Sequence, residues 1–294
     1  MLTQLIANGL VSGCLYALMA LGFVLIYNTT RIFHIAHGAV YTAGAYLLYL
    51  FLIVAEMSFL PAALLTLLFS AGMGVGIEFL VYRPLEKRKS SLLIALLSSI
   101  GLYTVMVNLI AMLFGNETKV LRPGVETTYQ FANIILTKIQ LAEVITFAIL
   151  FPLVMLLLKT TFWGKAVRAV RDHPQLAEVM GIRIQTIRYS VFALGSLLAG
   201  VAAMLAALDV GMDPHVGMPM LLVGAVAVIV GGVGTFAGAV LGAFFIALLQ
   251  SLVIWQISAR WIDAVTFLIL ILFLVFKPEG ILGVRKRVEE ALAR

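Results

Sequence analysis

The chain has 294 residues, of which 63% are hydrophobic and only 12% are charged, and its net charge is +6. Soluble domains carry about 25% charged residues, so this composition excludes an ordinary soluble domain and indicates a protein that lies in lipid. The basic residues stand in short clusters between apolar stretches, which is typical of side chains that set membrane orientation and not of nucleic-acid binding.

The N-terminal apolar stretch is too long for the core of a signal peptide, and no basic region precedes it. We therefore interpret it as a retained spanning helix. It holds Cys14, the only cysteine of the chain, which rules out an internal disulfide and favours a small apolar side chain.

Nine apolar stretches follow one another, and most of them approach the length of about 20 residues that a spanning helix needs. They cover residues 4–27, 36–54, 59–82, 91–114, 141–159, 189–208, 219–232, 237–257 and 262–277. A polar segment, 115–140, separates the fourth stretch from the fifth. The sequence predicts an all-α polytopic membrane protein with about eight to nine transmembrane helices, as one transmembrane domain over residues 1–294.

Basic residues mark the side of the membrane on which each connection lies, because cytoplasmic loops are enriched in Lys and Arg. They gather at 83–89, in the insert 165–188 and in the tail at 285–287. Nine crossings with the N-terminus outside place all three segments in the cytoplasm. The stretch 219–232 is short and ends in glycine, so a re-entrant or broken helix is an alternative that changes the count.

The insert carries signals for a short helix over about 173–180. Asp172 and Gln175 have the spacing of a capping box, Pro174 falls in the first turn, and Gly181 suits a left-handed stop. An apolar stripe at i, i+3 and i+4 runs along this helix, formed by Leu176, Val179 and Met180. Such a stripe fits a groove on a partner protein. The alternative is an amphipathic helix that rests on lipid headgroups.

Two histidines, His34 and His37, stand three residues apart at the start of the second apolar stretch. A metal site needs three or four ligands, and neither cysteine nor carboxylate lies near them in the sequence, so we predict no metal. The other histidines, His173 and His215, fall on opposite sides of the membrane in the predicted topology. Helix capping, hydrogen bonds between helices and the lining of a polar path remain as interpretations.

A weak internal repeat relates the first and sixth stretches, which cross in opposite directions in the predicted topology. Thr42-Ala-Gly-Ala follows the first and Thr235-Phe-Ala-Gly-Ala follows the sixth, as an inverted repeat with broken helices would require. The glycines at 231–238 lack the spacing of a nucleotide loop, and they indicate either a tight turn or a broken helix that borders a substrate site. Neither a Walker A motif nor a catalytic triad is present, so any transport energy is expected from another subunit.

Several motifs together resemble the permeases of bacterial branched-chain amino-acid ABC importers. They are Gly13-x-x-Tyr16-Ala17-Leu18, Ile35-Ala36-His37-Gly38, Ala177-Glu178-x-Met180-Gly181-Ile182, Gly231-Gly232-x-Gly234 and Lys277-Pro278-x-Gly280-Ile281-Leu282-Gly283. The likeness covers nearly the whole chain in the expected order. The chain departs from the family where His34-Ile35 replaces the usual Asn-Phe, which leaves the ligand class open: related permeases also serve urea, short amides and other small molecules.

The resemblance implies a multi-pass protein of the bacterial inner membrane, with the C-terminus and residues 160–188 in the cytoplasm, and without a cofactor. Its partners would be a second, homologous permease chain in a heterodimer, two ATP-binding cassette subunits and an extracytoplasmic substrate-binding protein. The insert would be the coupling helix that docks on the ATPase, through Arg171, Asp172, His173, Pro174, Leu176, Ala177, Glu178, Met180 and Gly181. The candidate translocation path comprises Tyr16, His34, His37, Tyr41, Gly232 and Gly234. A self-powered carrier or channel is the rival interpretation, and a membrane enzyme ranks last because no catalytic groups cluster.

Overall fold

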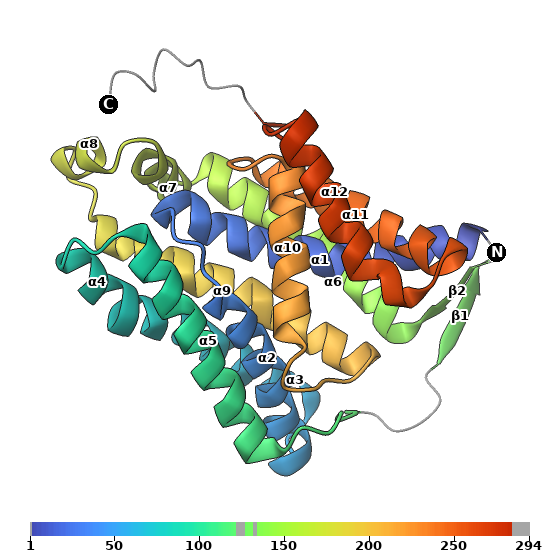
Figure 1. The fold of residues 1–294 in the computed structure, drawn as a ribbon. Helices are drawn as coiled ribbons and strands as arrows, with labels where there is room; N and C mark the ends of the chain where they lie inside the picture. Colours follow the sequence, from blue (N-terminus) through green and yellow to red (C-terminus); the bar gives the residue numbers. More distant parts are fainter. Residues whose placement is uncertain (1, 122–126, 132–133, 284–294) are drawn as a thin grey trace.

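The computed structural model describes residues 2–121, 127–131 and 134–283 (Figure 1). The first half of the chain forms α1 (Leu2–Thr30), α2 (Ala36–Tyr49) with the π-helical turn η1 (Leu50–Val54), α3 (Phe59–Ile77) with the π-helical turn η2 (Glu78–Tyr82), α4 (Arg83–Lys87) and α5 (Leu92–Phe114). The rest forms β1 (Thr128–Phe131), β2 (Ile134–Thr137), α6 (Lys138–Thr160), α7 (Phe162–Asp172), α8 (Pro174–Val179), α9 (Ile184–Asp209), α10 (Gly217–Gly231), α11 (Phe236–Gln256), the 3₁₀ turn η3 (Ala259–Trp261) and α12 (Ile262–Phe276).

The predicted all-α polytopic class is confirmed. Among the described residues, eight helices are long and apolar enough to cross a membrane, and the shorter α10 coincides with the stretch that was in doubt. The antiparallel pair β1–β2 was not predicted, because it lies in the polar segment 115–140, which has no strong period-2 pattern. The basic tail at 285–287 lies outside the described residues.

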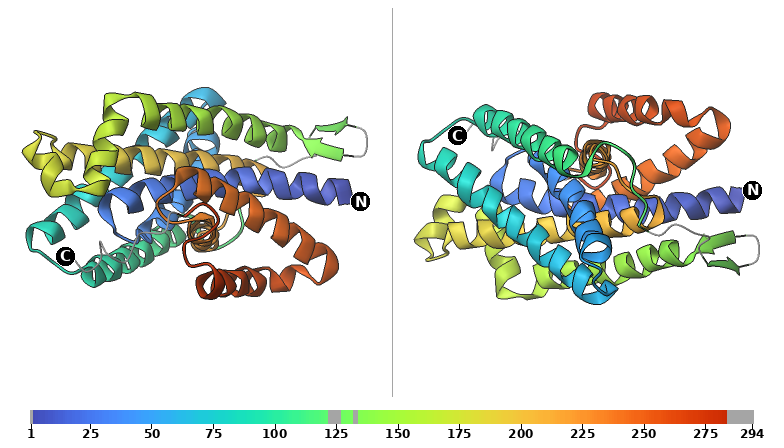
Figure 2. Two further views of the ribbon diagram at one scale, coloured as in Figure 1. Left: turned by 90° about the horizontal axis from the view of Figure 1, so that it is seen from above. Right: turned by 90° about the horizontal axis from the view of Figure 1, so that it is seen from below.

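The two ends of the bundle differ in what they hold (Figures 1 and 2). At one end, α1 begins beside the hairpin, where Gln4 Nε2 donates to the Ile135 carbonyl over 2.9 Å. At the other end, Arg31 adopts a left-handed backbone (φ 59°) that terminates α1, and it donates to the Arg171 carbonyl in α7 over 3.5 Å. Helix α9 runs in the opposite direction, since its last residue, Asp209, bonds to the residue before α6.

The helix packing repeats within the chain, and α1, α2 and α3 correspond to α9, α10 and α11. Helix α1 packs on α11 as α9 packs on α3, and α2 packs on α9 as α10 packs on α1. The corresponding helices α1 and α9 also contact each other, and so do α2 and α10. Because α1 and α9 run antiparallel, this arrangement agrees with the inverted repeat that the sequence predicted.

The chain returns into the bundle after α1 and again after α9. Gly22, eight residues before the end of α1, faces the His37 ring, so α2 starts about 12 Å inside that end at a rise of 1.5 Å per residue. Gly38 in turn lies against the Gly217 carbonyl at the start of α10. The first turns of α2 and α10 therefore meet inside the bundle. At 15 residues α10 is shorter than the roughly 20 residues that a crossing helix needs.

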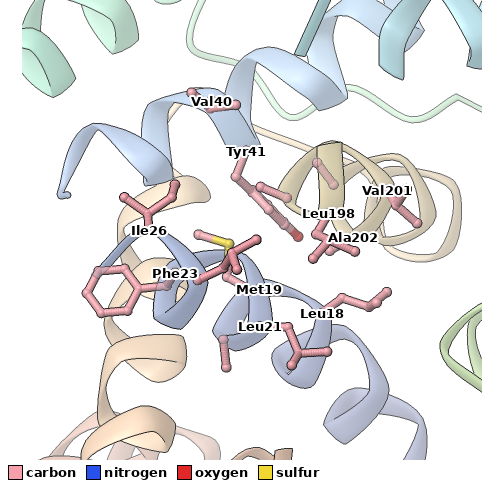
Figure 3. Packing of buried hydrophobic residues seen from close by; sticks show 14 of the residues in the cluster. Leu18, Met19, Leu21, Phe23, Ile26, Val40, Tyr41, Leu198, Val201 and Ala202 are labelled. Carbon is pink, nitrogen blue, oxygen red and sulfur yellow. The ribbon is translucent and has the colours of Figure 1, made fainter. Parts of the chain in front are cut away.

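The core lies where α1, α2 and α9 cross (Figure 3). Met19 and Leu198 are almost fully buried there, and Tyr41 of α2 points in between these two helices. Small residues hold the contact close: Gly22 and Gly195 each face the carbonyl of the other. In lipid, close backbone packing of this kind replaces the hydrophobic effect as the main attraction between helices.

Candidate functional site

The insert consists of two helices joined at an elbow, where the sequence predicted one. Thr161 caps α7 by accepting from the Gly164 amide over 3.1 Å, and α7 continues to Asp172. His173 forms the elbow (φ −146°, ψ 87°) and is the N-cap of α8, without a side-chain cap bond. The predicted capping box of Asp172 with Gln175 is therefore wrong. Asp172 is part of α7, and Arg171 engages its carboxylate with Nε 2.8 Å from Oδ1.

The Arg171–Asp172 pair has an electrostatic consequence at the bundle surface. The hydrogen bond from Arg171, together with its positive charge, lowers the pKa of Asp172 below its usual value. Arg171 also donates from Nη1 to the Gly234 carbonyl over 3.4 Å, in the turn between α10 and α11. One arginine thus links the end of α7 to that turn.

Helix α8 otherwise matches the prediction. Pro174 opens its first turn, and Gly181 ends it in a left-handed conformation (φ 85°), with the Ile182 amide donating back to the Ala177 carbonyl over 3.0 Å. Ala177 is buried toward the bundle. The three stripe residues point outward, with 61%, 85% and 81% of Leu176, Val179 and Met180 exposed. The helix therefore presents an apolar face to its surroundings. It lies at the end of the bundle that carries Arg31 and Arg171, here called the basic end.

Helix α7 anchors this face to the bundle. Trp163 Nε1 donates to Ser190 Oγ of α9 over 2.6 Å, and Arg168 donates to the Leu158 carbonyl of α6. Val167 and Val170 are buried beneath α7. Helix α7 contacts α1, α6 and α9, so it joins α8 to three helices of the bundle.

Three of the predicted path residues, His34, His37 and Tyr41, lie together in the interior, at the start of α2 and just before it. All three are almost completely buried. His34 Nδ1 lies 2.8 Å from the Tyr82 hydroxyl. Neither ring nitrogen of His37, nor the Tyr41 hydroxyl, has a hydrogen-bond partner within the part of the chain that the structure describes. Unpartnered polar groups at this depth are unusual, and they indicate a polar strip that can meet a guest molecule or water.

The remaining path residues lie elsewhere. Tyr16 donates to Gln250 Oε1 over 2.9 Å, and Gln250 donates to Thr266 over 2.8 Å, which joins α1 to α11 and α12. Gly232 and Gly234 sit at the basic end, in the turn beside Arg171. No three metal-ligating side chains gather among the described residues.

Comparison with known proteins adds the family. A family model described as branched-chain amino acid transport system / permease component matches residues 5–274. The chain belongs to this family. The permease is 29% identical to the high-affinity branched-chain amino acid transport system permease protein BraD of Pseudomonas aeruginosa, over 98% of its own length and 97% of that protein's. It is 30% identical to LivH, the corresponding protein of Salmonella typhimurium, with the same coverage of both chains.

A solved structure supports the fold of the permease. It is similar to PsaBC from Streptococcus pneumoniae in complex with Fab, with a TM-score of 0.53 at 12% identity, over 97% of the permease and 94% of that chain. At this identity the likeness concerns the fold alone. The family assignment makes the permease a multi-pass transport component and not an enzyme.

Sequence reasoning missed a deeply buried ion pair of the permease. Glu78 of η2 is fully buried, and Arg188 of α9 places Nε 2.6 Å from its Oε1. Glu78 lies within the apolar stretch 59–82, and Arg188 is the last residue of the basic insert, and no sequence pattern pairs them. The signal that could have paired them is the rule that a charge inside a bundle needs an opposite charge.

Glu143 of α6 is also fully buried, and its carboxylate lacks a partner among the described residues.

Proposed function

We propose that the permease is the membrane-spanning subunit of an ATP-driven ABC importer that translocates branched-chain or other hydrophobic amino acids. Its family and the names of its relatives support this cargo. The observation that carries the proposal is α8, a short helix that ends at Gly181 and has three exposed apolar side chains at the basic end of the bundle. Such a face suits a groove on an ATPase subunit.

The distribution of charge supports the orientation. Arg31, Arg171 and the 83–89 cluster belong to the same end as α7 and α8, and Glu56 and Glu117 belong to the connections at the hairpin end. By the positive-inside rule, the basic end faces the cytoplasm. We infer a bacterial inner-membrane protein with the C-terminus and residues 160–188 on the cytoplasmic side.

The mechanism follows from the contacts of the insert. Closure of two ATPase subunits would push on Leu176, Val179 and Met180, and the elbow at His173 would carry the movement into α7 and α9. Two such permease chains, homologous but different, would form the pathway, and an extracytoplasmic binding protein would deliver the cargo. Rigid-body movement of this kind switches the side to which a path opens.

The path itself would run along the buried polar strip. We assign His34, His37 and Tyr41 to its inner wall, with Tyr16 on the neighbouring face of α1. Gly232 and Gly234 would lie at its cytoplasmic mouth, next to Arg171. The polar groups of the strip that lack partners within the described structure are available to a passing solute.

Reconstitution in liposomes tests the proposal. The complete complex, purified with its ATPases and binding protein, should take up labelled leucine only with ATP, and unlabelled urea or acetamide in excess should not compete. ATP-driven uptake of urea instead of leucine would favour the small-amide alternative. Leucine flux through the purified permease alone would contradict the ATP-driven mechanism and support a channel or carrier.

A further inference from the structure

The π-helical turn η2 holds two buried polar side chains that reach different parts of the bundle. Glu78 stands at its first position and Tyr82 at its last, and neither side chain is exposed. π-helical turns are rare, and they occur often at functional sites. The turn lies between α3 and α4, close to the end of the bundle that carries α8.

Glu78 connects this turn to the start of α9. Arg188 holds both carboxylate oxygens, with Nε 2.6 Å from Oε1 and Nη2 donating to Oε2 over 3.3 Å. Gln185 Nε2 donates to Oε1 over 3.1 Å. Gln185 and Arg188 belong to the first two turns of α9, and only a few residues separate them from α8. Two side chains at the start of α9 therefore tie Glu78 to the segment that follows α8.

Tyr82 connects the same turn to the start of α2. Its hydroxyl donates to Ser99 Oγ over 2.8 Å and lies 2.8 Å from His34 Nδ1. Ser99 Oγ also accepts from the Ala36 amide, the first residue of α2, over 2.9 Å. Tyr82 thus fixes the place where α2 begins inside the bundle.

Stability alone is a poor reason for the ion pair, because a buried pair gains little over well-packed apolar side chains of the same volume. A charge pair does fix the register of two elements, and hydrogen bonds of defined length do the same. Arg188 additionally contacts Glu86 of α4, whose side chain is about half exposed. The buried carboxylate of Glu78 therefore fixes α9 against η2, whereas the carboxylate of Glu86 lies at the surface.

We propose that Glu78 and Tyr82 are positioning residues that transmit the displacement of α8 to the start of α2. The inference rests on the proposed role of α8 as the ATPase contact. When α9 moves with α8, Arg188 draws η2 along, and Tyr82 carries the movement to His34 and Ser99. The first turn of α2 then shifts against the first turn of α10, where the polar strip lies.

The test compares transport with ATP use in the complete reconstituted complex. We expect Glu78→Gln and Tyr82→Phe to assemble and to hydrolyse ATP at nearly the wild-type rate. The number of substrate molecules moved per ATP should fall about tenfold, within the usual range of coupling between two sites. Glu86→Gln and Tyr189→Phe are the matched controls, because they change an exposed partner of Arg188 and the hydroxyl that accepts from Arg83. The control variants should keep the wild-type ratio.

The Tyr82→Phe variant guards against misfolding, since it keeps the ring that packs 5.4 Å from His34 and 5.6 Å from Phe192. If Tyr82→Phe assembles and keeps the wild-type ratio, the proposal is overturned. An equal fall in the Tyr189→Phe control also overturns it. Failure of the underlying function is distinguishable, because the wild-type complex itself would then show no ATP-driven uptake.

Discussion

Gly217 is the most sensitive position in the contact between α2 and α10, and alanine there gives the sharpest test of the fold. A Cβ atom at this position would lie 2.0 Å from the Gly38 carbonyl oxygen and 2.4 Å from Thr42 Oγ1. An ordinary contact needs at least 3.4 Å, so the two helices must separate by about 1.4 Å. Overpacking of this size costs about 1–3 kcal/mol. We therefore expect Gly217→Ala to lower the free energy of unfolding by that amount and to impair transport.

Two further glycines provide a graded series. Alanine at Gly38 would approach the Gly217 carbonyl to 2.8 Å, which requires a smaller movement, so its cost should lie below that of Gly217→Ala. At Gly76 of α3, a Cβ atom would have no neighbour among the described residues within 4 Å, and alanine there should be neutral or stabilise the helix by up to about 1 kcal/mol. Unfolding by SDS titration in mixed micelles measures all three. A Gly217→Ala protein as stable as Gly76→Ala would refute the contact between the two helix starts.

Three other predictions concern the insert and the bundle. Arg171→Glu introduces a charge that repels Asp172, and Ala177→Pro removes the amide that donates to the His173 carbonyl. Each variant should abolish uptake while membrane insertion survives. Uptake assays and membrane fractionation measure these two results, and full uptake by both variants would contradict the prediction. Tyr16→Phe strands Gln250 Oε1 and should cost about 1–3 kcal/mol in the same SDS titration, and an unchanged midpoint would count against that hydrogen bond. Arg171 lowers the pKa of Asp172, so the Asp172 carboxylate stays ionised above its normal pKa, and any stability that it adds is lost only as the pH falls through the lowered value. The ratio of uptake by Asp172→Asn to uptake by wild type should therefore stay constant from about pH 8 to 5. A ratio that changes over this range would contradict the pairing.

The sequence predicted the helices well because lipid imposes a simple requirement, a long apolar stretch for each crossing. The stretch 36–54 has the observed bounds of α2 and η1, and the stop at Gly181 is confirmed. The start of α9 at Ile184 was missed, because its first turn is polar and lies beyond the apolar stretch. Hydropathy reports which residues prefer lipid, and it does not report where a helix begins in water.

The site was harder to predict, since its residues meet only through packing. Asp172 matched the pattern of an N-cap, but α7 extends to include it. In the structure its carboxylate pairs with Arg171, which also contacts the distant Gly234. The pairing of Glu78 with Arg188 spans 110 positions and depends on α3 lying against α9. A single sequence does not contain that adjacency. The outward direction of the α8 stripe, in contrast, agrees with the i, i+3, i+4 spacing of Leu176, Val179 and Met180.

Cross-linking from α8 tests the central claim most directly. A cysteine introduced at Leu176, which is 61% exposed, is the accessible thiol of such a variant, because Cys14 is buried. Met112 near the end of α5, at the other end of the bundle, is the matched control with an exposed apolar side chain. In the assembled complex, Leu176→Cys should cross-link to the ATPase subunit and Met112→Cys should not. The absence of a cross-link from Leu176→Cys, or an equal yield from Met112→Cys, would contradict the account.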